Sequence, residues 1–283
     1  CVWSITDRAD FSRMNLRNGI LAGGNFIIDH VKLIDAWPAQ DMLATIVQET
    51  SSNGGGPYNV LKDLAAMRAP FPLSAAGLVG HDAHGAWIIN DCQKAGIDIT
   101  QLHRTADSPT SYTDAMTVMS TGRRTFFHQR GANALLGAQH FDFQQTQARV
   151  FHLGYLMLLD EMDRELPDDG TVAAQVLEAA QRHGLITSVD IVSTENPRFR
   201  PITEAALPHI DHLVINEIEA GKIVGVDLRS GSSVRVRACI DAAQRLIQKG
   251  VRQQVVIHFT DGAVAADADG QVTLQGSLQL PPG

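Results

Sequence analysis

Residues 185–224 have the sequence LITSVDIVSTENPRFRPITEAALPHIDHLVINEIEAGKIV, and this stretch decides the fold class. Its pattern predicts a strand from Leu185 to Asp190, a helix near Thr203, a strand from His212 to Ile215 and a helix from Glu217 to Val224. Short apolar strands that alternate with helices are joined by right-handed crossovers, so they form a parallel sheet with helices on both faces. The stretch therefore predicts an α/β fold with a mostly parallel central sheet.

The same alternation extends along most of the chain. Pro57 opens a predicted helix directly after Gly54-Gly55-Gly56, because proline is favoured in the first helical turn. The apolar run from Gly19 to Asp29 is bounded by glycines, and it predicts a strand that is buried on both faces and ends in the Asp29 carboxylate. Further strands are predicted at 73–79, 150–158 and 254–259, and further helices at 82–94, 171–183 and 234–249.

Two early segments do not follow this alternation. Residues 31–51 and 108–128 both have the pattern of strands, and Thr121-Gly122 within the second segment is a hairpin turn signal. They suit a small sheet that projects from the main body. We expect this sheet to form a lid over the carboxyl ends of the main strands, where the ligands of open α/β sheets bind.

Composition excludes several classes of function. The chain has 23 Lys and Arg against 31 Asp and Glu, a formal net charge of -8, and no dense basic run. Such a surface repels phosphate backbones, so we expect no nucleic-acid partner. The apolar runs are shorter than the roughly 20 residues of a membrane span, so we expect no membrane partner. Three widely separated cysteines, Cys1, Cys92 and Cys239, fit a reducing compartment, and the predicted location is cytoplasmic.

Several polar residues are predicted to lie at the ends of strands or the starts of helices. Asp29 could hold hydroxyl groups of a ligand, although a carboxylate after a strand more often serves as a cap or turn residue. The run Asn53-Gly-Gly-Gly-Pro-Tyr-Asn59 either forms a tight turn or lets a polar ligand approach the backbone. Asn216 and Glu219 either cap the helix that they begin or order water around Mg²⁺ near phosphates. Asp190 also ends a central strand, and the sequence assigns it no role.

Other motifs with catalytic meaning are weak or missing. His81 and His84 are three residues apart, but no third ligand lies at a useful spacing, and Asp82 is predicted to be a helix N-cap. The sequence contains no G-x-S-x-G elbow, no P-loop and no G-x-G-x-x-G fingerprint. We therefore expect no direct metal ligands.

Taken in order, these segments resemble the ribokinase-like (PfkB) family of carbohydrate kinases, from about Gly19 to Gly283. The ordered series carries the resemblance, since no single motif would. Its most specific members are Gly77-Leu-Val-Gly80-His-Asp82-Ala-His-Gly85 and Asn216-Glu-Ile-Glu219. The others are Gly24-Asn-Phe-Ile-Ile-Asp29, Gly54-Gly-Gly-Pro-Tyr-Asn59, Ala95-Gly96-Ile-Asp98, Gly122-Arg-Arg-Thr125, Gly131-Ala-Asn133 and Thr260-Asp-Gly262-Ala263.

The resemblance implies a fold and an activity. The fold would be a three-layer sandwich with a mostly parallel central sheet and a small β-sheet lid, in which residues 19–283 form the kinase domain and residues 1–18 an N-terminal extension. The activity would be the transfer of a phosphoryl group from ATP, with Mg²⁺, to a hydroxyl group of a sugar under the lid. By resemblance, the acceptor would be bound by Asp29, Gly54, Gly55 and Asn59, whereas Asn216, Glu219 and Gly262 would serve ATP and Mg²⁺.

The sequence departs from the family pattern at three places. Gly56 stands where the ribokinase branch tends to carry Lys, which argues against ribose as the specific acceptor. His258 and Thr260 stand where the nucleotide loop usually has Thr and Gly. The family also has a Gly-Ala-Gly-Asp segment whose Asp deprotonates the acceptor hydroxyl, and this segment does not occur here. The catalytic Asp is therefore expected beyond Gly283, and the 283-residue chain is predicted to be inactive or nearly so.

Three alternatives remain open on the sequence. The chain could be a nucleoside kinase of the same family, or a sugar- or nucleotide-binding regulator without catalytic activity. It could also be an α/β domain of unrelated chemistry, since fold does not fix function, and then Asp29, Asn59 and Glu219 would not converge. A second copy could cover the exposed edge of the lid sheet, so a homodimer through the lid is predicted.

Overall fold

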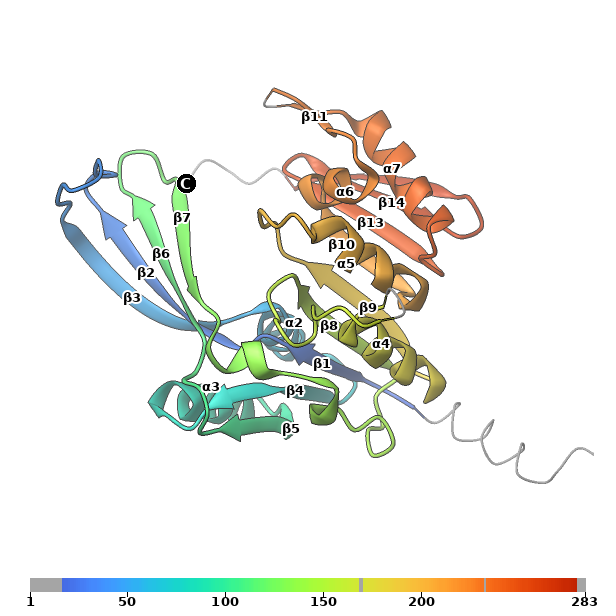
Figure 1. The fold of residues 1–283 in the computed structure, drawn as a ribbon, viewed down its shortest axis with the longest axis horizontal. Helices are drawn as coiled ribbons and strands as arrows, with labels where there is room; N and C mark the ends of the chain where they lie inside the picture. Colours follow the sequence, from blue (N-terminus) through green and yellow to red (C-terminus); the bar gives the residue numbers. More distant parts are fainter. Residues whose placement is uncertain (1–16, 168–169, 232, 279–283) are drawn as a thin grey trace, which may run out of the picture.

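The computed structural model describes residues 17–167, 170–231 and 233–278, so the predicted N-terminal extension (residues 1–18) lies outside the described residues apart from its last two. None of the helices in this part of the chain is long and apolar enough to cross a membrane. The described residues form a large sheet in the body of the molecule, a small four-stranded sheet that projects from it, and a short hairpin of β11 (Arg229–Ser230) and β12 (Ser233–Val234) (Figure 1).

The large sheet has nine strands in the order β15-β14-β13-β10-β9-β8-β1-β4-β5 among the described residues. Every neighbouring pair from β13 to β5 is parallel, whereas β13-β14 and β14-β15 are antiparallel. Parallel neighbours need a crossover, and helices supply it. The strands are β1 (Ile20–Gly24), β4 (Leu73–Gly80), β5 (Asp98–Thr105), β8 (Val150–Leu156), β9 (Ile186–Ile191), β10 (His212–Asn216), β13 (Gln254–Phe259), β14 (Gly262–Asp267) and β15 (Val272–Gly276).

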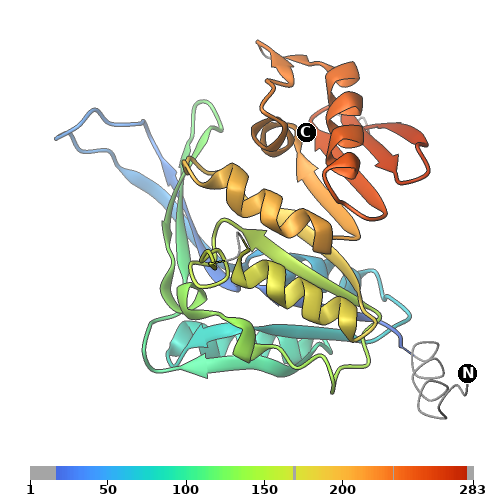
Figure 2. The ribbon, with the colours of Figure 1, turned by 45° about the vertical axis from the view of Figure 1, so that its right-hand side comes forward.

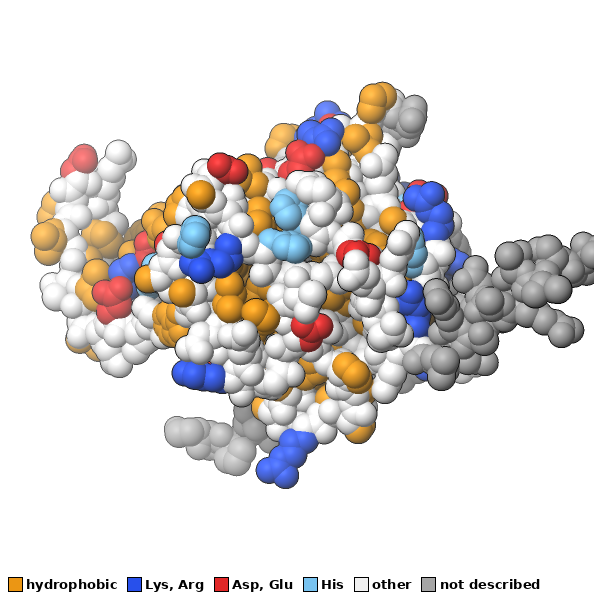
Figure 3. Space-filling model, turned by 90° about the horizontal axis from the view of Figure 1, so that it is seen from below, with side chains coloured by type: hydrophobic (Ala, Val, Ile, Leu, Met, Phe, Trp, Pro, Cys, Tyr) orange, Lys and Arg blue, Asp and Glu red, His pale blue; other side chains and the backbone are white. Residues whose placement is uncertain are grey.

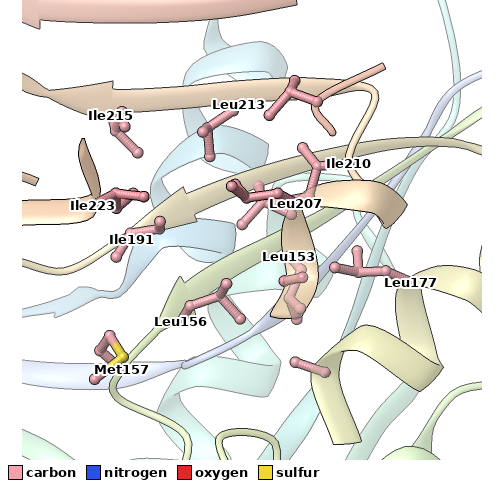
Figure 4. Close-up of a cluster of buried hydrophobic side chains, with 14 of the residues drawn as sticks. Leu153, Leu156, Met157, Leu177, Ile191, Leu207, Ile210, Leu213, Ile215 and Ile223 are labelled. Atoms are coloured by element: carbon pink, nitrogen blue, oxygen red, sulfur yellow. The ribbon is translucent and has the colours of Figure 1, made fainter. Parts of the chain in front are cut away.

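Helices cover both faces of the large sheet (Figure 2). Neighbouring residues of a strand point to opposite faces, and this alternation divides the buried side chains into two clusters. Leu21 of β1 packs in the larger cluster, part of which is shown in Figure 4, whereas Ala22 packs in the other with Leu61 and Ile88. The predicted three-layer sandwich is confirmed. Its helices are α2 (Gly56–Ala66), α3 (Ala83–Lys94), α4 (Val172–Arg182), α5 (Phe199–Ala206), α6 (Glu217–Val224) and α7 (Val236–Gln248).

The small sheet joins the two early segments that do not fit the alternation. Its strands are β2 (Ile27–Ile34), β3 (Ile46–Gly54), β6 (Tyr112–Val118) and β7 (Arg124–Gln129), in the order β3-β2-β6-β7. The sheet extends to the left of the body in Figure 1. The prediction of a separate small sheet is confirmed, although β2 starts at Ile27 and not at the predicted residue 31.

The prediction of one buried strand from Gly19 to Asp29 is wrong. β1 ends at Gly24 and β2 begins at Ile27. Asp29 is therefore the third residue of β2 in the small sheet, and it does not end a central strand. The cause is a close approach of two backbones. A Cβ on Gly24, whose φ is 128°, would lie 1.8 Å from the Gly154 carbonyl oxygen, and Asn25 N donates a hydrogen bond to that same oxygen (2.8 Å). The chain therefore leaves the large sheet at this point.

The strands at both edges of the large sheet were not predicted. β5 lies at one edge, and Leu102 is the one buried residue among its eight. β14 and β15 lie at the other edge, and β15 is exposed along its whole length. Strands without a buried apolar run give a weak sequence signal. By contrast, α6 and β13 begin and end at the predicted residues.

Large hydrophobic side chains are exposed on the small sheet and its loops. Trp37 stacks on Phe127 of β7 with ring centroids 6.2 Å apart, and the two side chains are 50% and 52% exposed. Hydrophobic side chains are also visible on the projecting part at the left of Figure 3. Surfaces of this kind often take part in protein contacts. The homodimer through this sheet stays a prediction.

Asp82 ties the base of the small sheet to the body. It is the N-cap of α3, as predicted, and its Oδ1 accepts a hydrogen bond from Gly85 N (2.8 Å). Its carboxylate also accepts hydrogen bonds from the backbone N and the Oγ1 of Thr110, both at 2.7 Å, two residues before β6 begins. Burial raises the pKa of Asp82, but these hydrogen bonds outweigh it, and the pKa lies below its ordinary value.

We expect Asp82→Ala to lower the free energy of unfolding by about 1–2 kcal/mol at pH 7, because the cap of α3 and the link to Thr110 are both lost. A lowered pKa means that this contribution is present above the unfolded value of about 4 and disappears as the pH falls through the folded value. Urea unfolding of both proteins at neutral and acidic pH measures it. An equal loss at the two pH values would contradict the assignment.

Candidate active site

The carboxyl ends of the parallel strands meet the base of the small sheet at one edge of the body (Figure 1). β8, β9, β10 and β13 end at this edge, and the chain passes from the end of β1 directly into β2. Ligands of open α/β sheets bind at the carboxyl ends of the strands. The candidate site is therefore built from these strand ends and from the adjoining residues of β2 and β3.

Asp29 and Gly54 are in direct contact at the base of the small sheet. Asp29 pairs with Ser52 of β3 and Thr113 of β6 across the sheet. A Cβ on Gly54 would lie 2.0 Å from Asp29 Oδ2, so a glycine is needed here to leave room for the carboxylate. Burial raises the pKa of Asp29, opposed by the charge of His30, and no described residue donates a hydrogen bond to its carboxylate.

Gly55 and Asn59 lie next along the chain, in the turn before α2 and in the first turn of α2. Gly55 has a φ of 100°, and a Cβ there would lie 2.1 Å from the Asn25 carbonyl oxygen, so its backbone passes directly over the chain that follows β1. The Gly55 carbonyl accepts a hydrogen bond from Asn59 N (2.9 Å), and the side chain of Asn59 is exposed in the first turn of α2. The structure thus places the four predicted acceptor residues along β2 and the turn from β3 to α2.

Asn216 and Glu219 form a capping box at the start of α6. Asn216 Oδ1 accepts hydrogen bonds from Ile218 N and Glu219 N, and Glu219 Oε2 accepts one from Asn216 N, each at 2.9 Å. Glu219 is only 3% exposed, and Ser193 Oγ donates to its Oε1 at 2.7 Å. Burial raises the pKa of Glu219 in spite of these hydrogen bonds. The capping role is confirmed, and the role toward Mg²⁺ stays a prediction.

Asp190 lies at the end of β9, and its charge interacts with that of Glu219. The one hydrogen bond that its carboxylate accepts from a described residue comes from Ile191 N (2.7 Å). Burial raises the pKa of Asp190 to about 7, and the negative charge of Glu219 adds to the rise. The site therefore contains a carboxyl group that holds its proton more strongly than an ordinary aspartic acid, beside a second buried acid.

Tyr155 interacts electrostatically with residues of both predicted groups, the acceptor-binding group and the nucleotide-binding group. Burial, together with the charges of Asp190, Asp29 and Glu219, raises its pKa to about 12. These acids come from β9, β2 and α6, so the charges of Asp29 on the predicted acceptor side and Glu219 on the predicted nucleotide side both act on one phenol. Tyr155 was not predicted as a site residue because it lies in an apolar run. Its polar ring near the end of a strand was the available signal.

Gly262 opens β14 directly after the turn at Thr260 and Asp261. A Cβ on Gly262 would lie 2.3 Å from the Gln275 carbonyl oxygen, so the pairing of β14 with β15 requires glycine. β13 pairs with β10 through His258 and Asn216, which places this turn at the same edge as the capping box. The glycine therefore has a structural reason, and the contact of this turn with ATP stays a prediction.

The oxygen atoms of Asp190 and Glu219 fit Mg²⁺. This ion prefers oxygen ligands, keeps several waters and takes one or two protein carboxylates. A nearby cation would lower the pKa of both acids, which burial raises. In the described part of the chain, no group of three or more His, Cys, Asp or Glu side chains is arranged to hold a metal ion. Contacts through water therefore remain the prediction.

A cavity of about 670 Å³ lies at the other edge of the large sheet. It is lined by residues at the amino ends of the strands, among them Asn18, Ser74 and Asp98. None of the predicted site residues lines it. The cavity is therefore separate from the candidate site, which is defined by its polar groups and backbone contacts.

Comparisons with known proteins point to a single family. A family model described as pfkB family carbohydrate kinase matches residues 23–277. A ribokinase of Schizosaccharomyces pombe is 25% identical over 235 residues, which cover 82% of this chain and 68% of that protein. The structure of Arabidopsis thaliana ribokinase complexed with ribose and ATP matches with a TM-score of 0.71 at 18% identity, over 92% of this chain and 78% of that one. A Xylella fastidiosa fructokinase matches with a TM-score of 0.69 at 20% identity, over 93% and 76%. The structural matches show a shared ribokinase-like fold.

We expect Asp190→Asn to stabilise the protein increasingly as the pH rises. With a raised pKa, the folded state holds its proton while the unfolded state releases it, so the wild type loses stability from about pH 4 to pH 7. The gain of the variant over the wild type should grow by roughly 2–3 kcal/mol between pH 5 and pH 8 without Mg²⁺. Urea unfolding at both pH values measures it, with the exposed Asp269→Asn as a control. Parallel curves for variant and wild type would rule out the raised pKa.

Proposed function

Because this chain belongs to the pfkB family of carbohydrate kinases, we propose that it transfers the γ-phosphoryl group of ATP to a hydroxyl group of a sugar. The observation that carries the proposal is the position of Asp29 against Gly54, of the Tyr155 ring against Gly56, and of Asp190 and Glu219 at the ends of the paired strands β9 and β10. The charges of the three acids all act on the Tyr155 phenol. An acceptor held at Asp29 and phosphates held near Glu219 would meet there. The Schizosaccharomyces pombe relative is named a ribokinase, and the Arabidopsis thaliana structure contains ribose and ATP, which supports a sugar and ATP as the substrates.

The acceptor side consists of Asp29, Gly54, Gly55 and Asn59. The Asp29 carboxylate receives no hydrogen bond from a described residue, so its lone pairs are available to sugar hydroxyls. Gly54 leaves room for that carboxylate. The exposed Asn59 amide in the first turn of α2 supplies both a donor and an acceptor for a second hydroxyl.

The proposed nucleotide side consists of Asn216, Glu219 and the turn at Gly262, and the raised pKa of Asp190 beside Glu219 supports including Asp190 with them. When bound between these carboxylates and ATP, Mg²⁺ would neutralise charge on the phosphates. The capping box holds the Glu219 carboxylate in place through backbone and side-chain hydrogen bonds. Phosphoryl transfer depends mainly on positioning and charge neutralisation, and these residues are suited to both.

The small sheet is proposed to act as the lid over the acceptor. Asp29 belongs to this sheet, so a change in its angle to the body would move the acceptor carboxylate relative to Asp190 and Glu219. Its base is tied to the body by the hydrogen bonds from Thr110 to Asp82 and by Asn133 Nδ2, which donates to the Phe26 carbonyl oxygen at 3.1 Å. Closure over the acceptor would exclude water from the reaction.

We expect the protein to consume ATP in a sugar-dependent reaction. A coupled assay over D-ribose, D-fructose, 2-keto-3-deoxygluconate and common nucleosides tests it. Asp29→Asn should lower kcat/KM for the sugar by about 10- to 100-fold, since hydrogen bonds to a charged group are the stronger kind.

Asp114→Asn is the matched control. Asp114 follows Thr113 on β6 and points to the opposite face of the small sheet, where its carboxylate pairs with Lys32. The control should keep the sugar KM of the wild type. Turnover with nucleosides alone would replace the proposal by a nucleoside kinase. Sugar binding without turnover would favour a non-catalytic regulator. The absence of both binding and turnover would refute the proposal.

We expect Glu219→Gln to raise the Mg²⁺ concentration for half-maximal activity by about tenfold, because one carboxylate charge near the phosphates is lost. Glutamine can replace glutamate in a capping box, so the melting temperature should stay close to that of the wild type. A titration of activity with MgCl₂ at constant ATP, together with thermal unfolding, separates the two effects. An unchanged Mg²⁺ requirement would remove Glu219 from the metal site.

A further inference from the structure

Tyr155 and Gly56 compete for the same space. A Cβ on Gly56 would lie 3.0 Å from Cζ, 3.1 Å from Cε1 and 3.4 Å from Cε2 of Tyr155. The hydroxyl end of the ring therefore lies against the backbone at the start of α2. Gly56 is a helical residue and is not among the glycines with positive φ, so any residue could adopt its backbone conformation. The space that the ring takes is thus the reason for glycine at this position.

The Tyr155 hydroxyl is a donor without a partner. No described residue forms a hydrogen bond with it, although the side chain is half-buried and lies among acidic groups. Its pKa of about 12 keeps the phenol protonated at neutral pH. The hydroxyl is not one of the fully buried polar atoms, so it is open to solvent and free to donate a hydrogen bond to a ligand bound beside the start of α2.

We propose that Tyr155 and Asp29 together recognise one hydroxyl group of the acceptor, and that Gly56 is glycine in order to admit the Tyr155 ring. This inference rests on the proposed sugar kinase function. An alcohol group both donates and accepts a hydrogen bond. The Asp29 carboxylate accepts a hydrogen bond from the alcohol O–H, and the Tyr155 phenol donates a hydrogen bond to the oxygen of the same alcohol. Asp29 and Tyr155 therefore match an alcohol. A ligand group that can only donate would leave Tyr155 without a partner, and one that can only accept would leave Asp29 without one.

Gly56 and Tyr155 share one part of the site. A side chain at position 56 would fill the space that the rigid ring from β8 occupies. A phenol donates from a fixed direction and loses little side-chain freedom on binding. The ring therefore supplies a neutral, directional donor beside the start of α2.

The test is a set of variants in the protein that supports turnover, with D-ribose and D-fructose as the probes at saturating MgATP. Tyr155→Phe keeps the ring and removes the hydroxyl, and it should raise the sugar KM about tenfold with kcat within about twofold. Gly56→Ala should displace the ring and raise the sugar KM at least about threefold. In the Tyr155→Ala background, Gly56→Ala should not raise the sugar KM further, because the contact between residues 56 and 155 has already been removed.

Tyr58→Phe is the matched control for the loss of a phenol hydroxyl. The Tyr58 hydroxyl donates to Asp91 Oδ2 at 2.6 Å, away from Asp29, so this variant should lower the melting temperature and leave the sugar KM unchanged. If the wild type phosphorylates a sugar and Tyr155→Phe changes only the melting temperature, the inference is overturned while the proposed function stands. If Gly56→Ala and Tyr155→Ala act additively on KM, the link between the two positions is overturned. If the wild type neither binds nor phosphorylates either sugar, the inference fails, and the remaining acceptors of the assay decide the proposed function.

Discussion

The two sheets are joined where backbone atoms approach one another more closely than a side chain would permit. A Cβ on Gly24 would lie 1.8 Å from the Gly154 carbonyl oxygen, and a Cβ on Gly55 would lie 2.1 Å from that of Asn25. The end of β1, the end of β8 and the turn from β3 to α2 are thereby held against one another by main-chain contact. Tyr155 and Gly56 are the next residues after Gly154 and Gly55, so their positions follow from this junction. The candidate active site depends on it more than on any single side chain.

Burial near the junction raises the pKa of acidic side chains, and the hydrogen bonds that described residues donate to these acids do not offset the rise. Away from the site, Asp91 accepts hydrogen bonds from Tyr58 and Lys62, and these lower its pKa although burial acts against them. Asp190 and Glu219 have raised pKa values because burial outweighs the hydrogen bonds that they accept. Acids with raised pKa values tend to gather at functional sites, where a ligand or cation relieves the cost. The contrast between these acids and Asp91 separates the candidate site from the structural ion pairs of the same protein.

Sequence patterns predicted the layers of this fold better than the junction between them. α6 and β13 were predicted to the residue because each combines an apolar pattern with a clear boundary, the Asn216 cap in one case and the loop after Phe259 in the other. The break at Gly24 was missed because apolar residues resume directly after Asn25 and continue to Ile28, and the Gly154 oxygen that forces the turn is 130 residues away in the chain. Tyr155 was missed for the same reason: its three acidic neighbours come from other elements. Local pattern therefore identified Asp29, Asn216 and Glu219 as candidates, whereas their convergence required the fold.

The parallel pairing of β2 with β6 also constrains the order in which the protein can fold. Asp29 pairs with Thr113, and the intervening chain contains α2, β4, α3 and β5, of which β4 and β5 belong to the large sheet. A contact across so long a loop forms slowly until other structure has brought its ends together, and an isolated hairpin is only marginally stable. This topology favours completion of the small sheet after β1, β4 and β5 have paired. A nascent chain would then carry Asp29 as an ordinary exposed acid, and the carboxylate would become desolvated only when the N-terminal half of the protein has finished folding.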